Sequence, residues 1–316
     1  EDGIRDRSPS RGLGDVYKRQ GGSNIAIGED AGIAITSGVN NIILGTAAGD
    51  NLTTGSYNIA IGQGALSAED GNGRNVAIGQ GTLAVQNAGA DAYNVAVGYE
   101  AGVSVTTGVE NTLVGAGSGD ALTIGNYNTT LGAFALGLSV DGDYNTAIGY
   151  NSGTALTTGG NNVAVGAHAL TANTTAADNV AVGVSALAAN TTGTNNTAVG
   201  RAALSTNTTA AGNTAVGQTA LQLNTTGVNN TALGRSALVA NTTGAQMTGI
   251  GYGSFDSNTT GYNNTGCGYW SGAGTTTGHS NTGLGAYCLL SNTTGNFNTA
   301  VGAGAMQATG QSNVGN

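Results

Sequence analysis

The chain has few of the residues on which catalysis and nucleic-acid binding depend. Its 316 residues include two histidines, two cysteines and one proline, and the 17 acidic residues outnumber the 8 basic ones. Catalysis needs titratable groups that converge, and phosphate binding needs clustered Lys and Arg. No apolar run reaches the ~20 residues of a membrane helix. The composition therefore predicts a non-catalytic protein with no cofactor, no nucleic-acid partner and no membrane span in this segment.

One phrase dominates the sequence. Residues 196–212 read N-T-A-V-G-R-A-A-L-S-T-N-T-T-A-A-G, and the next 17 residues, from Asn213, repeat the phrase as N-T-A-V-G-Q-T-A-L-Q-L-N-T-T-G-V-N. The glycine that closes N-x-A-V-G recurs from Gly28 to Gly302 at spacings of 17, with one spacing of 19 between Gly79 and Gly98. A fixed period of this length indicates a repeat architecture.

Residues 1–20 lie outside this period. They contain the only proline, the only lysine and four of the seven arginines. Ser10 to Gln20 matches one reading frame of a sequencing adapter, and Glu1 to Asp6 matches a second adapter in the same frame. We therefore expect residues 1–20 to be a non-native, adapter-derived and disordered segment; the alternative is a basic targeting or nucleic-acid-binding arm. We expect the repeat array to span residues 21–316 and to be truncated at both ends.

The repeat predicts an all-β fold. Gly and Asn are frequent, and Val, Ile and Thr alternate with Ala, which suits strands and tight turns. A unit of 17 residues is too short for a helix pair, which needs roughly 34. We expect a parallel β-solenoid, or β-roll, of about seventeen coils. Each coil would contain two short strands joined by turns.

The coil positions can be numbered from the asparagine of N-x-A-V-G. Position 4 is Val, Ile or Leu in every coil except at Cys267, so we expect positions 2 and 4 to face inward together. Gly at position 5 should allow the backbone to turn. The position-1 asparagine, replaced only by Met247, should stack into a ladder of amides. The ladder residues are Asn24, Asn41, Asn58, Asn75, Asn94, Asn111, Asn128, Asn145, Asn162, Asn179, Asn196, Asn213, Asn230, Asn264, Asn281 and Asn298.

Positions 9 and 12 compensate for each other. Where position 9 is Leu, as at Leu204, position 12 is usually Asn, as at Asn207; where position 9 is Gly, as at Gly153, position 12 is apolar, as at Leu156. This pattern predicts that one large side chain per coil fills a close-packed interior. The coil with Gly272 breaks the rule. The N-T-T-G phrase at positions 12 to 15 predicts a turn.

Several phrases carry a family resemblance. N-I-A-I-G (24–28), N-V-A-I-G (75–79) and N-T-A-V-G (196–200) resemble the head repeats of trimeric autotransporter adhesins. The longer unit N-T-T-G-x-N-N-T-A-V-G-x-x-A-L is similar to arrays of phage tail fibres and marine surface proteins. The resemblance covers residues 21–316 and implies a left-handed β-roll wound into a homotrimer. The period of 17 is longer than that of the adhesin heads, which leaves handedness and trimer packing open.

Candidate binding residues are sparse. His168 and His279 occupy different coil positions, and Cys267 and Cys288 read as small apolar residues. Calcium, which prefers oxygen ligands, has weak candidates in Asp70, Asn72, Asp141 and Asp143. Threonine pairs could bind ice or glycans, although adjacent residues of a strand face opposite sides. These residues are Thr174, Thr175, Thr191, Thr192, Thr208, Thr209, Thr225 and Thr226. Aromatic residues before the ladder asparagine could stack on sugars; they are Tyr57, Tyr93, Tyr127, Tyr144 and Phe297.

The sequence therefore favours a structural or adhesive rod of an extracellular adhesin or phage tail fibre, located outside the cell, on its surface or on a virion. Its expected partner is itself, as a homotrimer or an end-to-end polymer, together with a host-surface glycan or protein. The alternatives are a self-assembling extracellular filament and an ice- or glycan-binding solenoid.

Overall fold

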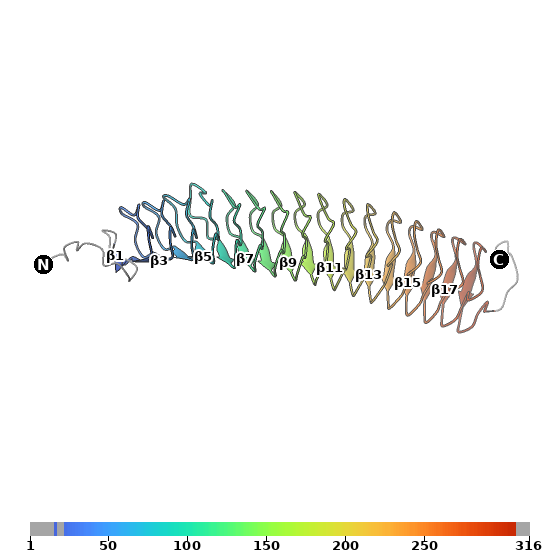
Figure 1. Ribbon diagram of the computed structural model, residues 1–316. Helices are drawn as coiled ribbons and strands as arrows, with labels where there is room; N and C mark the ends of the chain where they lie inside the picture. The colour runs from blue at the N-terminus through green and yellow to red at the C-terminus, as the bar shows by residue number, and fades with distance from the viewer. Residues whose placement is uncertain (1–15, 18–21, 308–316) are drawn as a thin grey trace, which may run out of the picture. The chain divides into compact units, whose positions relative to one another are not determined.

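The computed structural model describes residues 16–17 and 22–307, which belong to two compact units divided between Asn128 and Thr129. Within each unit the described residues form a parallel β-solenoid without helices, as the sequence predicted (Figure 1). Unit 1 contains β1 (Val16–Tyr17), β2 (Ile25–Ile27), β3 (Ile42–Leu44), β4 (Ile59–Ile61), β5 (Val76–Ile78), β6 (Val95–Val97) and β7 (Thr112–Val114). Unit 2 contains β8 (Thr129–Leu131), β9 (Thr146–Ile148), β10 (Val163–Val165), β11 (Val180–Val182), β12 (Thr197–Val199), β13 (Thr214–Val216), β14 (Thr231–Leu233), β15 (Thr248–Ile250), β16 (Thr265–Cys267), β17 (Thr282–Leu284) and β18 (Thr299–Val301).

The strands of successive coils pair in parallel and in register within each unit. Val180 lies opposite Thr197, which is 17 residues later, whereas Val76 lies opposite Val95 across the 19-residue coil. The two extra residues are therefore absorbed outside the strands, and the repeat resumes in phase. Among residues 1–20, only Val16–Tyr17 is described, and it pairs antiparallel with β2. The rest of the segment expected to be adapter-derived and disordered lies outside the described residues.

Each coil contains one three-residue strand, at positions 2 to 4, where we expected two. The other side of the coil is a series of turns because its backbone is left-handed at alternate positions. In the coil of Asn196, Gly200, Ala202 and Leu204 have φ values of 137°, 57° and 50°. Residues with positive φ interrupt an extended strand, so the second side closes the coil without joining the sheet.

The strand faces are the reverse of the sequence expectation. Position 3 is the buried one: Ala198 is 0% exposed, while its neighbours Thr197 and Val199 are half-buried on the outer face. Cys267, expected in the core, is accordingly exposed. The physical reason is the narrow interior, since a Cβ on Gly249 at position 3 would lie 3.1 Å from Leu238 of the preceding coil. The leucine at position 9 already fills this space, which leaves room for alanine or glycine.

The predicted volume compensation between positions 9 and 12 is confirmed. Leu156 is 1% exposed, and a Cβ on Gly153 would lie 3.1 Å from its Cδ1 atom. Large side chains at other positions also fill the core, which the rule for positions 9 and 12 did not include. Leu113, at position 3, packs over Gly119 in the same coil. The exception at Gly272 is explained by the buried ring of Phe255 from the preceding coil, which occupies the space where a Cβ of residue 272 would be.

Candidate functional site: two ladders and the outer rows

The position-1 asparagines connect each coil to the next through hydrogen bonds of both side-chain atoms. In the coil of Asn213, the backbone N–H of Asn230 donates to Asn213 Oδ1 at 2.9 Å, and Asn213 Nδ2 donates to the carbonyl of Gly227 at 2.9 Å. The ladder asparagines of the described residues are at most 8% exposed, so these amides are structural groups inside the coils and not surface ligands. Met247 interrupts the ladder, although its backbone N–H still donates to Asn230 Oδ1.

A second ladder lies at position 12, where the sequence predicted only a turn. Asn224 Nδ2 donates to Asn207 Oδ1 at 3.0 Å, and Asn241 Nδ2 donates to Asn224 Oδ1 at 2.9 Å. The same Nδ2 atom of Asn224 also caps its own turn by donating to the Gly227 carbonyl at 2.9 Å. The signal that could have revealed this ladder is the recurrence of Asn in successive coils from Asn173 to Asn258, since a turn alone also accepts Asp, Ser or Gly.

The threonine pairs divide into an inner and an outer member. The first threonine is half-buried, and its hydroxyl donates to a threonine carbonyl of the next coil, as from Thr191 to Thr208 at 3.0 Å. The second threonine, such as Thr192, is exposed. Of the candidate outer-face residues, Thr174, Thr191, Thr208 and Thr225 therefore hold coils together, and Thr175, Thr192, Thr209 and Thr226 are the ones that face solvent.

The candidate metal ligands do not converge. No group of three or more His, Cys, Asp or Glu side chains is placed to hold a metal ion within the described residues. Near Asp70, the Asn72 backbone N–H donates to Glu69 Oε1 at 3.1 Å. Asp141 is exposed and Asp143 half-buried in a separate turn.

The described part of the chain has no helix long and apolar enough to cross a membrane.

Glu69 is a buried carboxyl group at position 12, the place of the second ladder. It is 0% exposed, and its Oε2 atom has no hydrogen-bond partner within the described residues. Burial raises the pKa of Glu69, because a carboxylate loses its hydration inside the coil. Desolvation likewise raises the pKa of Asp120 and of Asp256.

The last position of each coil, just before the next ladder asparagine, forms a surface row in unit 1; it is position 17, or position 19 in the 19-residue coil. Successive coils place Tyr57, Arg74, Tyr93, Glu110 and Tyr127 there, and we call these five residues the outer row. All five have left-handed backbones, with φ of 63°, 66°, 52°, 57° and 58°. The same local conformation in neighbouring coils gives the five Cα–Cβ bonds similar directions relative to their coils.

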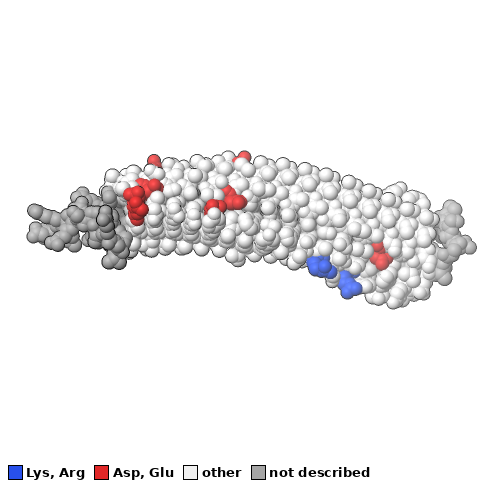
Figure 2. Space-filling view, in the orientation of Figure 1, with Lys and Arg blue, Asp and Glu red and all other residues white. Residues whose placement is uncertain are grey.

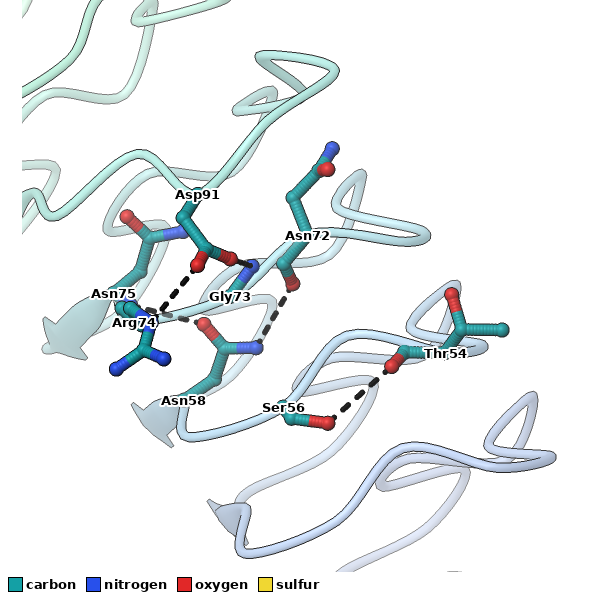
Figure 3. Close-up of polar contacts among 8 residues, drawn as sticks. All are labelled: Thr54, Ser56, Asn58, Asn72, Gly73, Arg74, Asn75 and Asp91. Atoms are coloured by element: carbon teal, nitrogen blue, oxygen red, sulfur yellow. Dashed lines mark hydrogen bonds and ion pairs between the residues drawn. The ribbon is translucent and has the colours of Figure 1, made fainter.

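Arg74 fills the interval between two tyrosines of the outer row. Its guanidinium carbon lies 5.0 Å from the ring centroid of Tyr57 and 5.7 Å from that of Tyr93. Its Nε donates to Asp91 Oδ2 at 2.8 Å, and Asp91 Oδ1 accepts the Gly73 backbone N–H at 3.1 Å (Figure 3). Asp91 lies within the insertion of the 19-residue coil. The insertion thus supplies the carboxylate that fixes the arginine between the rings.

The next interval of the outer row is open. An open surface depression of about 400 Å³ is lined by Tyr93 and Glu110. Tyr93 and Tyr127, on either side of Glu110 in the row, are 51% and 42% exposed. This interval therefore offers an aromatic ring and a carboxylate to solvent. The tyrosines were noticed in the sequence, but Arg74 and Glu110 were not, because their pairing with the rings depends on coil stacking.

Unit 2 carries a second aromatic surface, at positions 6 and 7. Tyr252 and Tyr269 stack with centroids 5.3 Å apart, and Trp270 lies 6.0 Å from Tyr252. The Arg235 guanidinium lies 5.0 Å from the Tyr252 centroid. In Figure 2, acidic side chains are visible on the first coils and again farther along the chain, where the basic side chains are also visible.

Both histidines make contacts with aromatic rings. His168 packs edge-on against Tyr150 at 5.5 Å, and His279 stacks on Tyr262 at 4.6 Å.

Comparisons with known proteins give no further guide to function: no protein-family model, curated protein or solved structure matches this chain. The arguments below therefore depend on the geometry of the described residues.

Proposed function

We propose that the chain is a non-catalytic structural segment of an extracellular adhesin or phage tail fibre, and that it assembles as a homotrimer through its strand face. The observation that supports the proposal is the outward apolar face of positions 2 and 4. In unit 1 these positions are almost all Ile, Val or Leu, and Ile25 and Ile27 are 50% and 41% exposed. In unit 2, Leu131 is 52% and Leu233 is 47% exposed.

An apolar surface of this kind, formed by positions 2 and 4 in unit 1 and mainly by position 4 in unit 2, is a surface for association. Monomeric soluble proteins rarely expose large contiguous apolar patches, and such patches mark interaction sites. The side chains repeat with every coil along the sheet of each unit, because the strands are in register. A partner whose ridges match this face at every coil must have the same spacing between coils. Another copy of the same chain meets that condition without any adjustment.

The interior is suited to a mechanical role. In the coils from Asn173 to Asn258, two asparagine ladders and the threonine hydroxyls hydrogen-bond successive coils, in addition to the parallel sheet. Each coil is therefore attached to its neighbour at several points around its perimeter, and bending a unit would strain all of them together. The resemblance of N-x-A-V-G phrases to adhesin head repeats supports the same proposal, with adhesion performed by exposed Thr and aromatic side chains.

Sedimentation equilibrium of the full chain tests the proposal. A single species of three times the 30.6 kDa chain mass is expected. A monomer at micromolar concentration would contradict it, and polymers that lengthen with concentration would favour the filament alternative.

A second candidate function follows from the later coils of unit 2. From β12 to β18, the first strand residue is threonine in every coil, and Thr214, Thr231 and Thr265 are exposed on the sheet face. A flat, evenly spaced array of hydroxyl and methyl groups could order water as an ice-binding surface. This function needs the strand face to be free. Thermal hysteresis of a monomeric sample would favour ice binding. Its absence would favour the trimer, in which the strand face is covered.

A further inference from the structure

We propose that the open interval of the outer row, between Tyr93 and Tyr127 and over Glu110, binds the guanidinium group of an arginine from a partner polypeptide. This site goes beyond the structural role, because it uses the side chains of the outer row and not the strand face. It does not require any particular number of chains in the assembly.

The chain contains its own example of such a complex. In the preceding interval, the Arg74 guanidinium lies between the Tyr57 and Tyr93 rings, with centroid distances of 5.0 and 5.7 Å. The Asp91 carboxylate accepts its Nε–H at 2.8 Å. Two tyrosines, a carboxylate and a guanidinium thus form one unit, in which cation–π contacts and a charge-assisted hydrogen bond act on the same group.

The next interval places an aromatic ring, Tyr93, and a carboxylate, Glu110, beside an open surface depression. Tyr93 again forms one side, Tyr127 follows in the row, and the residue between them is Glu110. Since Arg74 and Glu110 share a left-handed backbone, with φ of 66° and 57°, their Cα–Cβ bonds have similar directions relative to their coils. Glu110 is too short to cover the ring as Arg74 does, and the depression of about 400 Å³ lies beside it and Tyr93. The space that the arginine side chain fills in one interval is therefore open in the other.

The charge of unit 1 favours a cationic ligand. Its described residues from 22 to 128 contain nine acidic side chains and one basic one. The basic residue, Arg74, makes the only ion pair within the described part of the chain, with Asp91. A surface of one sign raises the local concentration of oppositely charged partners. An anionic glycan would meet repulsion here, whereas an arginine would be attracted.

The geometry favours guanidinium over ammonium. A guanidinium group is planar, stacks on aromatic faces and can donate to a carboxylate while it is stacked. A lysine ammonium is a compact, strongly hydrated charge that cannot fill the space between two rings in this way. The ligand class is therefore arginine in an exposed, flexible or extended segment of another protein.

The test is a ligand-observed NMR titration of the full chain with Nα-acetyl-arginine amide at low salt. Saturable binding is expected for arginine, weaker binding for the matched lysine amide and none for the neutral citrulline amide. Glu110→Gln should weaken binding about two- to fivefold, the range for an exposed ion pair. Glu110→Arg should abolish saturable binding, because the new side chain occupies the interval as Arg74 does.

Asp178→Arg is the matched control. Asp178 also lies at position 17, is exposed and has a left-handed backbone with φ of 61°, but its row neighbours are Asn161 and Asn195. This variant makes the same change in net charge and should bind arginine amide as the wild type does. The proposal is overturned if Glu110→Arg still binds, if Asp178→Arg loses as much, or if citrulline amide binds equally well. Circular dichroism of both variants confirms that each is folded.

Discussion

The side-chain oxygen of Asn196 accepts a hydrogen bond from the backbone N–H of Asn213 at 3.0 Å, and so the first residue of one coil satisfies the first residue of the next. At this position, just before the strand begins, the side-chain oxygen of the asparagine replaces the backbone carbonyl that would accept this hydrogen bond in a sheet. Asn213 in turn provides the acceptor for Asn230. A buried backbone donor needs such a partner, and a residue without a side-chain acceptor at position 1 would leave it unpaired.

Removal of one ladder amide should therefore be costly. Asn213→Ala leaves the Asn230 N–H without its acceptor, whereas the Gly227 carbonyl loses one of two donors and keeps Asn224 Nδ2. Because one buried backbone donor is left without a partner, we expect the free energy of unfolding to fall by about 1–3 kcal/mol, as measured by urea denaturation. Thr226→Ala, an exposed change in the same coil, should alter it by less than about 0.5 kcal/mol. Equal losses in both variants would contradict a structural role for the ladder.

The position-5 glycine is fixed by both conformation and space. Gly217 has φ of 133°, and a Cβ there would lie 2.6 Å from the carbonyl carbon and oxygen of Gly234. Gly64 also has a positive φ, of 64°, but a Cβ would meet nothing within 4 Å. Gly64→Ala should cost about 1–2 kcal/mol for the left-handed backbone alone. Gly217→Ala should cost clearly more, because successive coils must separate.

Chemical denaturation of the two glycine variants measures the difference between them. Equal destabilisation of Gly64→Ala and Gly217→Ala would contradict the claim that close contact between consecutive position-5 glycines excludes a side chain there.

Glu69 should make stability depend on pH. Its pKa is raised in the folded chain by burial, so folding favours the protonated carboxyl. This contribution is fully present below the unfolded pKa of about 4.5 and is lost as pH rises through the folded pKa. Glu69→Gln should therefore raise the melting temperature at pH 8 relative to the wild type, and the gain should shrink toward pH 4.

Differential scanning calorimetry at several pH values measures this effect. Glu110→Gln, which removes an exposed carboxyl group, controls for the change in net charge. A gain for Glu69→Gln that stayed constant from pH 4 to pH 8 would show that burial of the carboxylate is not its source.

The period, the parallel coils and the exchange of volume between positions 9 and 12 could be predicted from the sequence, because each is a relation between residues at fixed spacing. The prediction of which strand residues face the core was wrong for a physical reason. Val199 is larger and more apolar than Ala198, so the usual pattern places it inside. The interior beside the strand is already filled by position-9 leucines such as Leu238, which only the stacked coils reveal.

The contacts of the outer row could not be predicted from the sequence, because they join residues of different coils. The sequence showed Tyr57 and Tyr93 before the ladder asparagines, but their rings were not expected to enclose Arg74. That arrangement depends on the insertion that brings Asp91 to the arginine. The second asparagine ladder was missed because residues such as Asn224 also satisfy a turn, and a single amide performs both tasks.

The central claim is that the outward strand face joins copies of the chain, and a triple lysine variant at Val182, Val199 and Val216 tests it most directly. These side chains are half-buried and outward, so the variant should keep the circular dichroism spectrum of the wild type. The matched control places lysine at the exposed Thr192, Thr209 and Thr226. By sedimentation equilibrium, we predict a trimer for the wild type and the control, and a folded monomer for the variant. An unfolded variant would contradict the outward orientation, and an unchanged mass would contradict association through this face.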